Sequence, residues 1–296
     1  MLYRSIYIGN PAHLKLKDKQ LKITDPTTQT VKGSVPIEDL GLLMLDHYQI
    51  TVSHQLLQEL MKNNVVLISC DEKHLPSGAM LPFGGNTQYS ERVKTQLEVS
   101  EPLKKQLWKQ TIECKILNQA KVLEHLGKYA DPMYDYLKEV KSGDTTNMEG
   151  IAAQHYWKYF IDYEFLRDRF GEYPNQFFNF GYGVLLSIVA RALVDTGLLL
   201  VLGIFHRNKY NPYCLASDIM EPYRPIVDLL VMEWLTTHPE VEELNKESKA
   251  HILQMATRDV QIEKNIHPLI VAVKNTASSL YKCYTGEKRL IAYPEL

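Results

Sequence analysis

The sequence predicts an α+β fold: a β-rich N-terminal domain over residues 1–95 and a larger, all-α C-terminal domain over residues 96–296. Two observations lead to this prediction. The first part holds short alternating or apolar segments between Pro and Gly residues. From residue 96 onward, apolar residues recur at helical spacing, with no further convincing strand until the last residues. A chain of 296 residues, 45% of them apolar, can bury cores of this size.

The N-terminal domain is predicted to contain strands and one short helix. Four segments have the alternating or buried pattern of strands: residues 14–17, 21–23, 50–52 and 65–69. Ser53 stands where an N-cap is needed for a helix over residues 54–64. The stretch LPSGAMLPFGGN, residues 75–86, is rich in Pro and Gly and predicts a loop that closes this domain.

The rest of the chain is predicted to be helical. Ser100 is placed to cap a long helix, and Pro102 lies in its first turn. Further helices are expected over residues 131–141, 228–244, 248–261 and the start of 268–296. The apolar stretch 184–205 is the best candidate for a membrane span. Arg191 and Asp195 interrupt it and stand four apart, where they can pair, so a buried helix is expected instead.

Composition excludes several classes of protein. The net charge of −2 means that any nucleic-acid binding must depend on local basic patches or on a basic partner. The four cysteines lie far apart, which argues against a zinc ribbon or a secreted disulfide framework and fits the cytoplasm. No phosphate-binding glycine loop and no serine-hydrolase elbow occurs.

Residues 202–228 contain the strongest candidate site. His206 is followed by two carboxylates, Asp218 and Glu221, which are three residues apart and would share one face of a helix opening at that point. Glu149, next to small residues, is the candidate for a further ligand. One imidazole and two or three carboxylates suit Mg²⁺ or Mn²⁺, and such ions support phosphoryl displacement.

Each candidate also has a structural alternative. Thr146 and Glu149 have the spacing of a capping box, in which the glutamate reaches back to the N-cap amide. His206 could complement the C-terminus of the preceding helix, and Asp218 could cap the following one. Three basic side chains are candidates for DNA-phosphate contacts: Arg207, Lys209 and Arg224.

At these residues the sequence resembles the CRISPR-associated Cas1 family, and within it the type II branch found with Cas9. The resemblance covers essentially the whole chain. It is carried by LPSGAMLPFGGN, LKKQLWKQTIECKILNQAKVL, MEGIAAQHYW, NFGYGVLLSIVARALVDTGL and LGIFHRNKYNPYCLASDIMEPYRPIVD. Relatives often carry a second His before the ligand His. Here that residue is Phe205, which leaves His206 as the only candidate.

The resemblance implies a metal site of Glu149, His206 and Glu221, with Asp218 as a supporting acid. It implies a metal-dependent DNA integrase and endonuclease of spacer acquisition, in which the 3′-hydroxyl of a short DNA fragment attacks the leader end of a CRISPR array. The expected assembly is a homodimer, two of which clamp a Cas2 dimer, with other acquisition proteins and Cas9 as further partners. Two alternatives remain: a metal-dependent nuclease acting on branched DNA, and a non-enzymatic scaffold.

Overall fold

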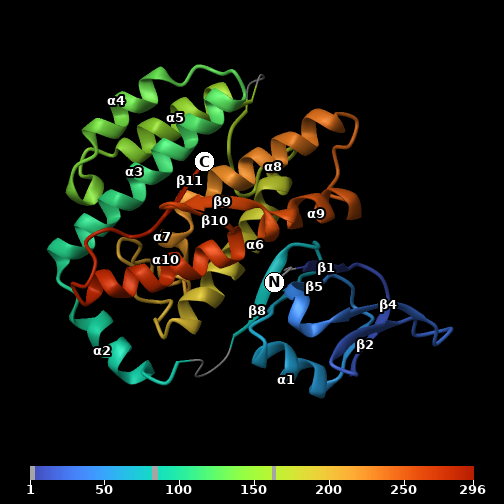
Figure 1. The fold of residues 1–296 in the computed structure, drawn as a ribbon. Helices are drawn as coiled ribbons and strands as arrows, with labels where there is room; N and C mark the ends of the chain where they lie inside the picture. Colours follow the sequence, from blue (N-terminus) through green and yellow to red (C-terminus); the bar gives the residue numbers. More distant parts are fainter. Residues whose placement is uncertain (1–3, 82–85, 162–164) are drawn as a thin grey trace.

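The computed structural model describes the chain except for residues 1–3, 82–85 and 162–164. A β-rich part comes first and a mainly helical part follows, so the predicted α+β class is confirmed (Figure 1). Within residues 4–81 the strands form two four-stranded sheets, in the orders β1-β5-β7-β8 and β4-β3-β2-β6. The strands are β1 (Arg4–Ile8), β2 (Ala12–Lys17), β3 (Gln20–Thr24), β4 (Val31–Pro36), β5 (Leu40–Leu45), β6 (Ile50–Val52), β7 (Val66–Cys70) and β8 (Pro76–Met80).

The central strands of the first sheet are buried on both faces. In β5, Leu43 faces a small core that also contains Leu21 of β3 and Leu56 of α1 (His54–Lys62). The neighbouring Leu42 and Met44 face the opposite way and belong to the large helical core. Because side chains alternate along a strand, one sheet separates two cores and joins the two parts of the molecule.

The predicted N-terminal elements are largely confirmed. The four predicted strand segments fall in β2, β3, β6 and β7, and Ser53 Oγ accepts a hydrogen bond from the Leu56 N–H at 3.4 Å. The loop prediction for residues 75–86 is wrong over Pro76–Met80, which forms β8, antiparallel to β7. Its prolyl residue is tolerated because β8 is an edge strand. Residues 82–85 of that segment lie outside the described residues.

The second part is built mainly from helices around the large core. They are α2 (Tyr89–Glu98), α3 (Glu101–His125), α4 (Asp131–Glu139), α5 (Met148–Phe160), α6 (Asn175–Asp195), α7 (Cys214–Ile219), α8 (Arg224–Thr237), α9 (Lys246–Leu253) and α10 (Leu269–Tyr284). Short 3₁₀ turns are η1 (Ile37–Asp39), η2 (Ser142–Asp144), η3 (Glu221–Tyr223) and η4 (Gln254–Thr257). The predicted cap of the long helix is confirmed, since Ser100 Oγ accepts from the Leu103 N–H at 3.4 Å.

A small sheet in this part was not predicted. Strands β9 (Asp259–Ile262), β10 (Asn265–Pro268) and β11 (Pro294–Glu295) pair in the order β10-β9-β11. The helix expected over residues 248–261 therefore ends at Leu253. Strand β11 is also tied to α3, because Asn118 Nδ2 donates to the Pro294 carbonyl at 2.9 Å and to the Pro222 carbonyl at 2.9 Å.

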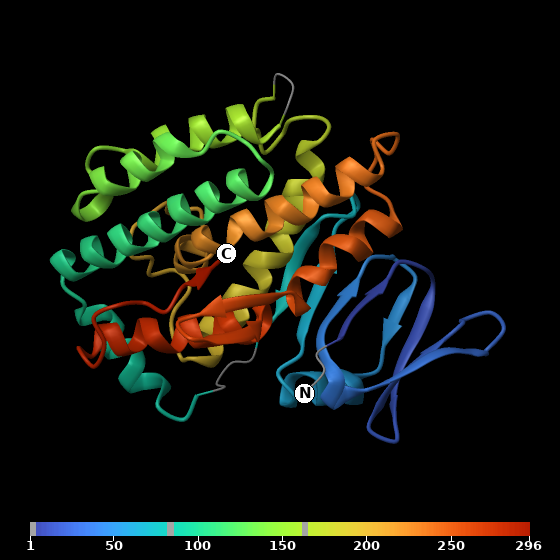
Figure 2. The same cartoon turned by 45° about the horizontal axis from the view of Figure 1, so that its top comes forward.

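Helix α6 crosses the interior between α8 and α10 (Figure 2). It is long and apolar enough to cross a membrane, but 72% of its apolar window is buried inside the protein, as expected for a core helix. The predicted pair is present, with Arg191 Nη1 3.5 Å from Asp195 Oδ1. The helix does not continue to residue 205: it ends at Asp195, before Gly197, whose φ of 82° lies in the left-handed region.

Candidate functional site

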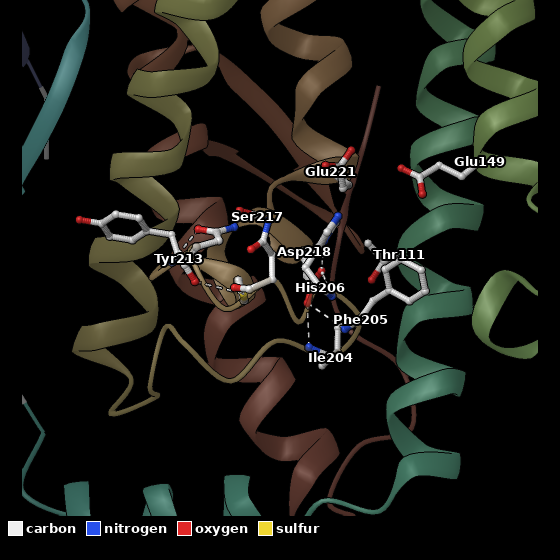
Figure 3. Close-up of polar contacts among 12 residues, drawn as sticks. Thr111, Glu149, Ile204, Phe205, His206, Tyr213, Ser217, Asp218 and Glu221 are labelled. Atoms are coloured by element: carbon white, nitrogen blue, oxygen red, sulfur yellow. Dashed lines mark hydrogen bonds and ion pairs between the residues drawn. The ribbon is translucent and has the colours of Figure 1, made fainter. Parts of the chain in front are cut away.

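The predicted site residues come from separate elements. Glu149 lies in the first turn of α5, His206 in the loop after α6, Asp218 in the last turn of α7 and Glu221 at the start of η3. In Figure 3 the Glu149 side chain points toward Glu221, and His206 lies beside Asp218. The expected shared helix face of Asp218 and Glu221 is wrong, because α7 ends between them. The two prolines around Arg224 explain the irregular start of α8.

Asp218 fixes the loop that carries His206. Its carboxylate is fully buried and accepts the backbone N–H groups of Ile204, Phe205 and His206 at 2.7, 3.0 and 3.1 Å. The same carboxylate lies 2.5 Å from His206 Nδ1. Asp218 therefore orients the ring by its Nδ1 side and leaves Nε2 available. The alternative in which Asp218 caps a following helix is wrong, since it ends one.

Packing reinforces this loop. The Phe205 ring stacks on buried Trp108 with 4.2 Å between centroids, and Trp108 meets the His206 ring edge-on at 5.7 Å. A Cβ at Gly203 would lie 2.5 Å from the His206 carbonyl oxygen and 2.7 Å from Asp218 Oδ2, so only glycine fits this close approach. The alternative role for His206 at a helix C-terminus is wrong, because α6 ends at Asp195.

Glu149 is not the capping residue of its own helix. The Asp144 carboxylate accepts the N–H groups of Met148 and Glu149 at 2.8 and 3.0 Å, and it satisfies the helix start. The capping-box alternative for Thr146 and Glu149 is therefore wrong. The Glu149 carboxylate extends instead toward α3, where its Oε1 lies 2.6 Å from Lys115 Nζ.

Lys115 is the residue that the sequence analysis missed. Its ammonium lies 2.6 Å from Glu149 Oε1 and 2.6 Å from Glu221 Oε2, so one cation joins two acids that are distant in sequence. Burial alone would lower the pKa of Lys115, but Glu221 and Glu149 raise it above its ordinary value. The sequence does contain a signal that Lys115 is buried. It stands one helical turn from Ile112 and Gln119, which lie on the inner face of α3.

Glu221 is held in its ionised form. It is 4% exposed, and its Oε1 accepts from Arg224 Nε at 2.9 Å. Burial would raise the pKa of Glu221, but the charges of Arg224 and Lys115 lower it below its ordinary value. The pKa of His206 is raised, foremost by its hydrogen bond to Asp218 and also by the nearby charges of Glu221 and Glu149. His206 and the acids therefore share one electrostatic centre.

Two cavities border this centre. A groove of about 760 Å³ reaches His206 and is also lined by Arg207 and Lys209. A cavity of about 330 Å³ lies on the Glu221 side and is lined by Lys115, Gln119, Ala153, Trp157, Arg167, Arg169, Tyr182, Glu221, Arg224 and Asp228. Arg207 pairs with Glu101, and the Arg224 guanidinium lies 4.5 Å from the centre of the Tyr182 ring. Basic groups therefore line both approaches to the acids.

The donor set fits a hard divalent cation. In the part of the chain that the structure describes, no three His, Cys, Asp or Glu side chains are close enough to hold one ion as they stand. Instead, the Lys115 ammonium lies between the carboxylates. Buried Glu221 Oε2 contacts this ammonium at 2.6 Å, and no second donor reaches it among the described residues, so one cation could replace another there. A place that already accepts one positive charge between two carboxylates suits Mg²⁺ or Mn²⁺.

Known proteins resemble this chain in sequence and in fold. Residues 6–264 match the family described as CRISPR associated protein Cas1. A CRISPR-associated endonuclease Cas1 from Neisseria meningitidis serogroup C is 33% identical over 299 residues, which cover 100% of this chain and 97% of that protein.

Solved structures of other proteins have the same fold. A casposase bound to an integration product superposes with a TM-score of 0.81 at 20% identity, over 99% of this chain and 93% of that one. A chain of a Cas6-RT-Cas1–Cas2 complex gives a TM-score of 0.71 at 16% identity, over 99% of this chain and 36% of that one. At such identities these two matches establish the shared fold. With the family match and the Neisseria relative beside them, the chain is a member of the Cas1 family.

Proposed function

We propose that this chain is a metal-dependent DNA integrase and endonuclease of CRISPR spacer acquisition. The observation that carries the proposal is that the Glu149 and Glu221 carboxylates both contact the Lys115 ammonium. The His206 ring lies beside them, and Asp218 holds it by Nδ1. The Neisseria relative is named an endonuclease, and the casposase is bound to an integration product, which supports both halves of the proposal.

In this proposal Glu149, His206 and Glu221 hold Mg²⁺ or Mn²⁺. When bound, the ion would stabilise the negative charge that develops during in-line displacement at phosphorus. The chain's own groups position the DNA: Arg207 and Lys209 on the groove side, and Arg224 on the Glu221 side, contact phosphates. The 3′-hydroxyl of the DNA fragment loses its proton and forms a new P–O bond with a phosphate of the array strand. The bond between that phosphate and the neighbouring 3′-oxygen breaks, and this oxygen gains a proton and becomes a free 3′-hydroxyl. One phosphodiester replaces another, so no external energy source is needed.

The proposed assembly is a homodimer, two of which bind a Cas2 dimer, with a short duplex and the array as DNA partners. A structural neighbour is part of a complex that contains Cas2, which supports this partner. Other acquisition proteins and Cas9 are further proposed partners, in the cytoplasm where the array lies. The net charge of −2 means that the basic grooves and the assembly must supply the attraction for DNA.

The test is strand transfer of a short duplex into a supercoiled plasmid that carries a leader and repeat, with Mg²⁺ or Mn²⁺ and with or without Cas2. Wild type should insert the duplex, and His206→Ala should lose the activity by more than about 100-fold. His54→Ala, an exposed histidine at the start of α1, is the matched control and should remain active. Equal insertion by wild type and His206→Ala would contradict the proposed site. Cleavage of branched DNA without insertion would favour a nuclease.

A further inference from the structure

We propose that Lys115 is a resident cation of this site: it holds Glu149 and Glu221 together before a divalent metal ion binds, and the metal ion displaces it. This inference rests on the proposed function and deepens it. It assigns to one buried lysine the task of keeping the metal-free site assembled and of setting how much metal is needed to activate it.

Lys115 and the proposed metal ion would use the same carboxylate oxygens. Lys115 Nζ contacts Glu149 Oε1 and Glu221 Oε2, each at 2.6 Å, and these are carboxylate oxygens that a shared metal ion would need. An ammonium and a divalent ion cannot both occupy the space between the same two oxygens. The lysine and the metal ion therefore compete, first for space and then through like-charge repulsion.

The metal-free site needs a positive charge between its acids. Glu221 is 4% exposed and Lys115 8% exposed, so neither charge is well hydrated. Without a cation between them the two carboxylates would repel each other, and the buried Glu221 would be poorly hydrated. Lys115 removes that problem, and it does so from α3, an element that carries neither acid.

A displaced Lys115 ammonium has space and a polar partner nearby. Lys115 lines the cavity of about 330 Å³, together with Gln119 and Asp228. Gln119 Oε1 is buried and accepts no hydrogen bond within the described residues, and it stands one turn further along the same helix face. The flexible four-carbon stem of lysine allows this swing. Arg224, by contrast, is fixed on Glu221 Oε1 at 2.9 Å and lies over the Tyr182 ring.

The experiment compares wild type, Lys115→Met and Lys115→Arg in two measurements without DNA. The first is the thermal unfolding midpoint in chelator, and the second is the Mn²⁺ concentration that gives half of the maximal thermal stabilisation. Lys109→Met is the matched control, because Lys109 pairs at 3.5 Å with Glu113 on the outer face of the same helix.

Lys115→Met should lower the unfolding midpoint in chelator by several degrees and should lower the half-saturating Mn²⁺ concentration at least tenfold, a change of about 1.4 kcal/mol. Lys115→Arg keeps the charge and should stay close to wild type in chelator, as should Lys109→Met. An unchanged Mn²⁺ requirement in Lys115→Met would overturn the inference. A weaker Mn²⁺ response in Lys115→Met would overturn it too, because it would make Lys115 an aid to metal binding.

Failure of this inference is distinct from failure of the proposed function. If wild type inserts DNA with Mn²⁺ while Lys115→Met has an unchanged Mn²⁺ requirement, the integrase proposal stands and the resident-cation role is wrong. If wild type neither inserts DNA nor responds to Mn²⁺, both proposals are wrong.

Discussion

Asp218 shows how much one buried side chain can organise. Its two oxygens accept three backbone N–H groups and the Nδ1 side of His206, so an extended loop keeps one shape without helix or strand. Leaving those donors unsatisfied in a buried place would cost roughly 1–3 kcal/mol each. The orientation of His206 therefore depends on a residue that need not touch metal or DNA.

Asp218→Asn is expected to impair the site without removing a proposed ligand. The amide keeps one oxygen but directs an NH₂ group at N–H donors, so the loop loosens. DNA insertion should fall roughly 10–100-fold. The pKa of His206, raised by Asp218 in wild type, should return toward its ordinary value in a histidine NMR titration of the metal-free protein. Ser217→Ala, one residue earlier, is the control. Unchanged titration and insertion would contradict this role.

The sequence predicted the residue types better than their partners. Glu149, His206 and Glu221 could be selected as candidates because one imidazole with hard carboxylates is a set of ligands that Mg²⁺ or Mn²⁺ accepts. Their structural alternatives were removed only by the fold; Asp144, for example, accepts the Glu149 N–H that a capping box would have paired with Thr146. Lys115 was missed because a lysine within a long helix is usually solvated. Its place one turn from apolar Ile112 pointed to the inner face of the helix, but one sequence does not show which acids that face meets.

Asp228 joins three helices at the scale of elements. From α8 it accepts hydrogen bonds from Tyr156 of α5 at 3.1 Å and Tyr182 of α6 at 2.5 Å. Only 1% of the residue is exposed, and this burial raises its pKa to about 6. The contact holds α5, which carries Glu149, against α8, which follows Glu221.

The stability of the protein should consequently depend on pH through Asp228. Unfolded Asp228 ionises near its ordinary pKa of 3.8, whereas the folded residue keeps its proton to about pH 6. The folded state thus binds more protons between these values, and stability falls as pH rises through them. Relative to Asp228→Asn, wild type should lose about 2 kcal/mol of unfolding free energy between pH 4 and 7 in urea titrations. If the unfolding free energy of wild type instead fell toward acid pH relative to Asp228→Asn, the raised pKa of Asp228 would be contradicted.

Helices and strands were predictable where the sequence pattern that specifies them spans only a few neighbouring residues. Ser53 and Ser100 mark helix starts with a side-chain hydrogen bond that sequence spacing reveals. The hairpin of β9 and β10 was not predicted, because its alternation lasts four residues and only Val260 and Ile262 are buried. Such short strands depend on pairing with β11 from the far end of the chain, which a local pattern does not contain.

Across the whole molecule, one buried ion pair connects the two parts. Asp46, which follows β5, is 3% exposed and contacts Lys249 Nζ of α9 at 2.6 Å. Tyr7 donates its hydroxyl to the same carboxylate at 2.5 Å, and His74 Nδ1 lies 2.8 Å from it. The sheet and the helical part therefore share a buried polar contact here, and a second one where Arg191 Nη2 of α6 donates to Asn64 Oδ1 at 2.9 Å.

Lys249→Met should destabilise the whole protein. It leaves Asp46 buried without its cation, a change that typically costs about 3–5 kcal/mol. Urea unfolding should move to a lower midpoint, while Lys264→Met, exposed in the turn between β9 and β10, should unfold like wild type. Equal midpoints for Lys249→Met and wild type would show that the two parts do not depend on this pair.

The double hydrogen bond of Asn118 has a practical consequence for labelling and purification. Its amide donates both to Pro294 in the last strand and to Pro222, the residue after Glu221. The Asn118 side chain therefore connects the backbone near Leu296 to the backbone beside Glu221. Affinity tags, fluorophores or surface tethers attached after Leu296 would therefore perturb the turn that contains Glu221, whereas the exposed Tyr48 lies in the β-rich part and is the better place for a label.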